Sequence, residues 1–187
     1  MNIGRLALVT AALATGTLAI SGEPKPKAPP RFEDYPAAET LVGQPVLPKI
    51  GRPSQRRYQT RIREGVEKGW GVYCDGVAQD RPGPNFAGDI IVIQWSCGAP
   101  CLMVAVVDAR TGEVYDPPLA VNRTLELPLL VMGNSVGRNP ELDFRKSSRL
   151  MIISATPNWF KEHPQSYRHY FAWESSQWVL VYKEPLD

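Results

Sequence analysis

Two apolar segments in the middle of the chain limit what it can fold into more than any other feature. Residues 90–95 (IIVIQW) and 102–107 (LMVAVV) are nearly continuous in apolar character and rich in β-branched side chains. Such runs are typical of central strands that are buried on both faces. The segment between them, Cys97-Gly98-Ala99-Pro100-Cys101, contains Gly and Pro and indicates a tight connection. We therefore expect two neighbouring strands joined by a sharp reversal.

Other segments with the composition of strands continue to the end of the chain. They cover residues 113–115, 125–132, 149–155, 167–173 and 178–182. The segment 125–132 contains Pro128, which places it at a sheet edge. The last two segments form a hairpin whose turn is Ser175-Ser176-Gln177. The segments 104–114 and 170–179 both have the order strand, acidic turn, strand. This is the hairpin pattern of propeller blades, but two copies are too few for a propeller. The expected fold is mainly β, with one antiparallel sheet or two packed sheets.

One helix is predicted at the start of the domain, over residues 54–68. Ser54 is its expected N-cap, and Gly69 is a suitable residue to end it. Tyr58, Ile62 and Val66 recur at intervals of four residues and form one apolar stripe. We expect this stripe to pack on the sheet.

A proline-rich segment precedes the helix. Residues 22–53 contain eight prolines, which fix φ and lack the backbone N–H donor, so neither a helix nor a strand ladder can run through them. The segment is interpreted as an extended tether, and whether it docks on the domain is left open. The predicted organisation is a signal peptide over 1–21, the tether over 22–53 and a single β-rich domain over 54–187.

The N-terminus has the features of an export signal. Arg5 supplies the positive charge, residues 6–20 form an uncharged and largely apolar run, and Ala19 to Ser21 offer a cleavage site after Ser21. The apolar run is shorter than the ~20 residues of a membrane span. An uncleaved anchor is the alternative. We expect a periplasmic or secreted protein without a membrane span after cleavage, in an oxidising compartment.

The charge balance and the cysteines restrict the chemistry. Lys and Arg number 21 and Asp and Glu number 19, which argues against nucleic acid as a partner. Cys97 and Cys101 are expected to form a disulfide that fixes the hairpin, although a redox role stays open. Cys74 is left over, and it is free, pairs with another chain or replaces one partner. No cysteine or histidine spacing indicates a metal site, and no motif indicates a cofactor.

Five short motifs occur in order between residues 85 and 173. They are Asn85-Phe86-Ala87-Gly88, Trp95-x-Cys97-Gly98-x-x-Cys101, Asp108-x-x-Thr111-Gly112-x-Val114-Tyr115, Ser148-Arg149-Leu150 and Tyr170-x-x-Trp173. Together they resemble a group of exported bacterial proteins of unknown function, in which His stands at the position of Asp89. The resemblance covers roughly residues 54–182 and implies a periplasmic β-rich domain, without an activity that can be carried over.

The sequence favours a non-catalytic binding or interaction module. Its expected contact is Trp159-Phe160, an aromatic pair in a loop bounded by prolines, and its expected partner is another envelope protein or a cell-wall glycan. The alternative is an envelope hydrolase or thiol-dependent enzyme that uses Cys97 or Cys101 with His169. Without such a role, we expect His169 to be a partly exposed residue of a strand.

Overall fold

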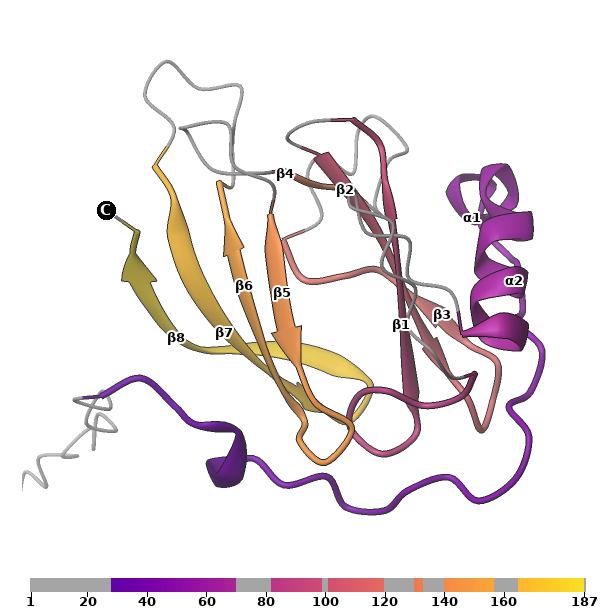
Figure 1. The fold of residues 1–187 in the computed structure, drawn as a ribbon, viewed down its shortest axis with the longest axis horizontal. Coiled ribbons are helices and arrows are strands. Elements are labelled where there is room, and N and C mark those ends of the chain that lie inside the picture. Colours follow the sequence, from indigo (N-terminus) through magenta and orange to yellow (C-terminus); the bar gives the residue numbers. More distant parts are fainter. Residues whose placement is uncertain are drawn as a thin grey trace, which may run out of the picture.

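The computed structural model describes residues 28–69, 82–98, 101–119, 130–132, 140–156 and 165–186. Two β-sheets face each other, two short helices lie outside the first sheet, and the N-terminal segment runs along one end of both sheets (Figure 1). The expected fold class, mainly β with two packed sheets, is confirmed.

The first sheet is built on the two apolar segments. β1 (Ile90–Ser96) and β2 (Cys101–Asp108) pair antiparallel over their whole length. Two short strands, β3 (Val114–Tyr115) and β4 (Leu130–Met132), pair with β2 on its other side. β4 is the end of the predicted strand 125–132, and Pro128 lies outside the described residues.

The second sheet is an antiparallel meander. Its strands are β5 (Glu141–Phe144), β6 (Leu150–Ala155), β7 (Tyr167–Glu174) and β8 (Gln177–Pro185), in that spatial order. The terminal hairpin is confirmed, and its turn is the pair Ser175–Ser176, both with positive φ. β5 was not predicted, although Glu141 to Phe144 alternates polar and apolar residues over four positions.

The main core lies between the sheets. Alternate side chains of each strand point inward, as the period of two requires. This core contains Val92, Val104 and Val106 from the first sheet, and Met151, Ile153 and Phe171 from the second. The outer face of the first sheet is also apolar because helix α2 covers it, which explains why β1 and β2 have no polar alternation.

The predicted helix is present in two pieces, α1 (Pro53–Arg57) and α2 (Gln59–Lys68), separated at Tyr58. The assignment of Ser54 as N-cap is wrong, because the helix begins at Pro53 and Ser54 is buried in the first turn. Pro53 fits this first position because a helix leaves that N–H unpaired in any case. The side chain of Gln55 accepts the backbone N–H of Gly51 and of Arg52, at 3.0 and 3.1 Å, and so takes over the role of the cap.

The apolar stripe of the helix packs as expected. Ile62 and Val66 are buried against the first sheet, with Tyr58 at the margin. Gly65 allows this close approach, because a Cβ there would lie 2.5 Å from the Ile93 side chain. Among the described residues, no helix is long and apolar enough to cross a membrane.

The described part of the tether, from residue 28 onward, is docked on the domain. Its first contact is with the second sheet: Pro36 bridges to Ser148, and the Ser148 hydroxyl donates to the carbonyls of Phe32 and Tyr35. Phe32 lies in η1 (Phe32–Asp34) and is buried in a small cluster with Leu150.

The same segment then crosses to the first sheet. The N–H groups of Leu41, Val46 and Lys49 donate to carbonyls at the strand ends, at 3.0, 2.8 and 2.8 Å, and the acceptors are Gly88, Ala109 and Gly112. These are single hydrogen bonds from non-proline residues, so the prolines between them do not prevent docking. The tether therefore links the two sheets at one end of the sandwich (Figure 1).

Candidate functional site

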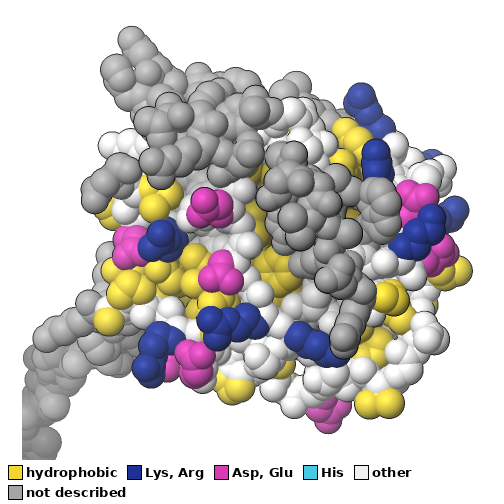
Figure 2. Space-filling model, viewed as in Figure 1, with side chains coloured by type: hydrophobic (Ala, Val, Ile, Leu, Met, Phe, Trp, Pro, Cys, Tyr) yellow, Lys and Arg dark blue, Asp and Glu magenta, His cyan; other side chains and the backbone are white. Residues whose placement is uncertain are grey.

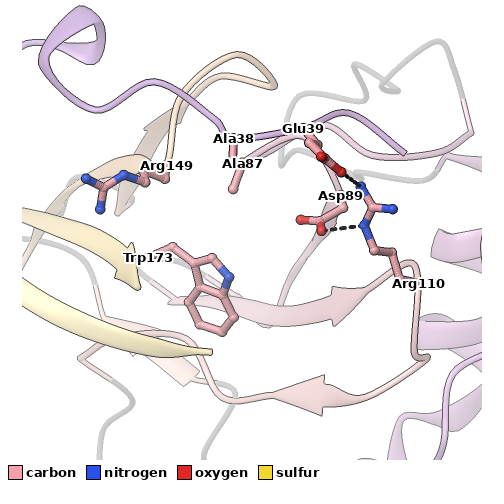
Figure 3. A pocket seen from close by; sticks show the side chains of 7 residues that line it. All are labelled: Ala38, Glu39, Ala87, Asp89, Arg110, Arg149 and Trp173. Carbon is pink, nitrogen blue, oxygen red and sulfur yellow. Dashed lines mark hydrogen bonds and ion pairs between the residues drawn. The ribbon is translucent and has the colours of Figure 1, made fainter. Parts of the chain in front are cut away.

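A pocket of about 410 Å³ lies where the tether crosses between the two sheets. Its lining comes from separate segments: the tether, the turn before β1, the β2–β3 turn, the residue before β6 and the end of β7. The lining residues are Ala38, Glu39, Ala87, Asp89, Arg110, Arg149 and Trp173 (Figure 3). The pocket exists only because the tether is docked, since Ala38 and Glu39 form one of its walls.

Arg110 provides one positive charge of the pocket, and both its backbone and its side chain are held. It lies in the β2–β3 turn, where a carboxylate oxygen of Asp108 accepts the backbone N–H groups of Arg110 and Thr111 at 2.7 and 3.0 Å. Its Nε donates to Asp89 at 2.8 Å, and its Nη2 lies 3.6 Å from the carboxylate of Glu39. Figure 3 shows both carboxylates on the same guanidinium. The turn and Asp89 therefore fix the direction of this side chain.

Arg149 provides the second positive charge, on the opposite side of the pocket (Figure 3). Its guanidinium forms an ion pair with Glu174 and lies over the Tyr35 ring, 5.2 Å from the ring centroid. Its backbone is held by the tether and by β7, since its N–H donates to Tyr35 and its carbonyl accepts from Trp173. Arg149 thus joins the tether to the second sheet.

Trp173 is the aromatic residue of the pocket. Its ring packs edge-on against Tyr115 and at an angle against Trp178, with centroid distances of 5.1 and 4.7 Å. The indole of Trp178 is itself fixed by a hydrogen bond to the carbonyl of Asp116. In Figure 3 the nitrogen-bearing edge of Trp173 faces Asp89 and Arg110. Packing therefore holds the indole in one orientation beside the charged groups.

The pocket combines one aromatic surface with two cations and two anions. Its volume lies within the range of small-molecule sites, which pair an apolar surface with a few polar groups that fix orientation. The lining charges cancel. On the face of the molecule drawn in Figure 2, the described Lys and Arg side chains are likewise interspersed with Asp and Glu side chains. Such a lining suits a ligand with many hydroxyl groups and an apolar ring face.

Cys97 and Cys101 form a disulfide, as the sequence predicts, with their Cα atoms 5.3 Å apart. The bridge closes the connection between β1 and β2. While it is intact, neither sulfur is a thiolate that can act as a nucleophile.

The expectation that His169 is partly exposed is wrong. Its side chain is 2% exposed, and it stacks on Phe171 on the inner face of β7. Burial, with a smaller contribution from the nearby positive charge of Lys183, lowers the pKa of His169. Its Nδ1 has no hydrogen-bond partner among the residues described. We interpret His169 as a residue of the core.

Several predicted site residues lie outside the described part of the chain, namely Trp159, Phe160 and Cys74. They remain predictions. Within the described ranges, no group of three or more His, Cys, Asp or Glu residues is arranged to hold a metal ion.

The pocket was missed from the sequence, although the quoted motifs contain part of its frame. Asn85 exchanges two hydrogen bonds with the backbone of Val92, Gly88 contacts the tether, and the Ser148 hydroxyl donates to the tether carbonyl of Phe32. Arg149 and Trp173 belong to the same motifs. Four of the five motifs thus meet around the docked tether, and the Cys97–Cys101 motif lies at the other end of the β1–β2 hairpin. The signal that could have pointed to the pocket was the presence of polar residues in these mainly apolar motifs.

No family model, curated protein or solved structure matches this chain.

Proposed function

We propose that this protein is an exported, non-catalytic module that binds a glycan of the cell envelope in the pocket beside Trp173. The observation that carries the proposal is the fixed indole of Trp173 next to the ion-paired side chains of Arg110 and Arg149. The predicted location is the periplasm or the medium.

The aromatic residue accounts for affinity. A sugar ring presents C–H groups on its faces, and a large amphipathic ring that is already held in place contacts such a face at little entropic cost. Trp173 is held by Tyr115 and Trp178, so it loses little freedom on binding.

The charged residues account for orientation. Hydroxyl groups of a sugar can donate to Asp89 and Glu39 and accept from Arg110. Since Asp89 and Arg110 already form an ion pair at hydrogen-bond distance, their positions are preorganised before a ligand arrives.

Two further features support a role outside the cytoplasm. The predicted signal peptide over residues 1–21 directs export, and a disulfide such as Cys97–Cys101 persists in oxidising compartments. The disulfide also favours binding over the alternative thiol enzyme, because that enzyme needs a free thiol beside His169. A buried His169 has no access to a substrate in the absence of a conformational change.

The proposal is tested by calorimetric titration of the exported protein with two kinds of oligomer. One is β-1,4-linked N-acetylglucosamine, and the other alternates N-acetylglucosamine with N-acetylmuramic acid. Replacing Trp173 by Ala should weaken binding at least about tenfold, which corresponds to ~1.4 kcal/mol. The matched control is Tyr167→Ala, at the opposite end of β7 and about 20 Å away. Wild-type protein that binds neither oligomer, or a Trp173→Ala variant that binds unchanged, would contradict the proposal.

A further inference from the structure

The two carboxylates on Arg110 are held very differently. Asp89 lies 2.8 Å from Nε in hydrogen-bond geometry, and its side chain is 28% exposed. Glu39 lies 3.6 Å from Nη2, beyond hydrogen-bond distance, and its side chain is 83% exposed. The outer end of the guanidinium is therefore only loosely occupied.

Glu39 is nevertheless brought to this position by the fold. The tether is anchored two residues later by the bond from Leu41 to the Gly88 carbonyl, and four residues earlier the Tyr35 carbonyl accepts the backbone N–H of Arg149. The carboxylate thus stays near Arg110 without a strong bond of its own. An exposed ion pair at this distance contributes little to stability.

We propose that the pocket selects a sugar that carries a carboxylate, and that this carboxylate replaces Glu39 on the outer end of Arg110. This inference rests on the proposed function and names its ligand class. The sugar ring lies against Trp173, Asp89 keeps the guanidinium oriented through Nε, and Glu39 turns into the solvent.

The exchange is favourable for two reasons. The planar fork of an arginine accepts a carboxylate through two parallel hydrogen bonds, which the present position of Glu39 does not provide. The charge in the pocket is unchanged by the exchange, because one carboxylate leaves as another enters.

The test compares two tetrasaccharides that share one backbone. One contains only N-acetylglucosamine, and the other alternates it with N-acetylmuramic acid, whose lactyl ether adds a carboxylate. Wild-type protein should bind the acidic oligomer about tenfold more tightly than the neutral one in calorimetric titration.

Three variants then separate the roles of the residues. Glu39→Gln removes the internal competitor, so affinity for the acidic oligomer should rise about threefold relative to that for the neutral one. Arg110→Gln should abolish the preference, because it lowers the affinity for the acidic oligomer more than that for the neutral one. The control is Glu33→Gln, which breaks another exposed ion pair of the tether, with Arg145, outside the pocket lining.

The outcomes are distinguishable. Equal affinity of the wild type for both oligomers would overturn the carboxylate inference and leave the proposed function standing. Binding of neither oligomer would overturn the proposed function itself. A fall in affinity for the acidic oligomer relative to that for the neutral one in Glu39→Gln would contradict displacement. If Arg110→Gln does not fold, the comparison of wild type with Glu39→Gln still decides the inference.

Discussion

Gly88 and Glu39 are in direct backbone contact: a Cβ at position 88 would lie 1.9 Å from the carbonyl oxygen of Glu39. Gly88 also has a φ of +85°, which residues with a side chain rarely adopt. The turn before β1 and the tether therefore fit together only while this position is glycine. The contact makes the tether part of the folded domain and places Glu39 at the pocket.

Replacing Gly88 by Ala should displace the tether. The backbone clash and the positive φ together should lower the free energy of unfolding by about 3 kcal/mol. The tether of this variant should also be cleaved faster in limited proteolysis. The control is Gly43→Ala, which has a φ of +108° but no atom within 4 Å of the added Cβ. Equal stability and equal cleavage rates in the two variants would refute the close fit.

The disulfide should contribute to stability without any role in binding. Because the bridge restricts the unfolded chain, it should raise the free energy of unfolding by about 2 kcal/mol even for so short a loop. Cys97→Ser should therefore shift the denaturant midpoint downward and leave the glycan affinity unchanged. A free thiol at Cys101 in wild-type protein from its native compartment, detected by alkylation, would contradict the structural role.

Burial of His169 should make stability depend on pH. Because the pKa of His169 is lower in the folded protein, the unfolded chain binds more protons between that pKa and the ordinary value near 6.5. Stability is therefore complete above about pH 6.5 and is lost as the pH falls toward the folded-state pKa, at no more than about 1.4 kcal/mol per pH unit.

Denaturant titrations between pH 5 and 8 measure this slope. His169→Gln should remove it, whereas His163→Gln, which changes the only other histidine, should keep it. A slope that persists in His169→Gln and disappears in His163→Gln would show that the wrong residue has been assigned.

The aromatic pair Trp159 and Phe160 offers a competing site. If the pocket beside Trp173 binds the glycan, replacing both loop residues by Ala should change the affinity by less than about twofold. Residues outside the few that dominate binding contribute little to affinity. Calorimetry on this double variant and on Trp173→Ala compares the two sites directly. Loss of binding only in the loop variant would transfer the site to the loop.

The main strands were predictable because their side chains repeat a local pattern. β1, β2 and the terminal hairpin follow from apolar runs and turn residues. β5 was missed because four alternating residues are a weak signal. The break at Tyr58 and the cap by Gln55 depend on neighbouring residues in space, which the helical period does not record.

The docked tether and the pocket could not be predicted in the same way. Prolines exclude a continuous ladder but say nothing about isolated bonds such as the one from Leu41 to Gly88. Asp89 and Arg110 are 21 positions apart in the sequence and Trp173 is far from both, and turn residues such as Asp108 are common in any sequence. Only the packing of the two sheets brings these side chains to one place.

The most direct test of glycan binding beside Trp173 is an NMR titration of the protein with the acidic tetrasaccharide. The chain has five tryptophans, so it gives five indole N–H signals, and Trp173→Phe identifies the one from the pocket. The account predicts that the Trp173 signal shifts most on addition of the sugar, while that of Trp95, buried on the far side of the first sheet, stays in place. An unmoved Trp173 signal at saturating sugar would contradict it.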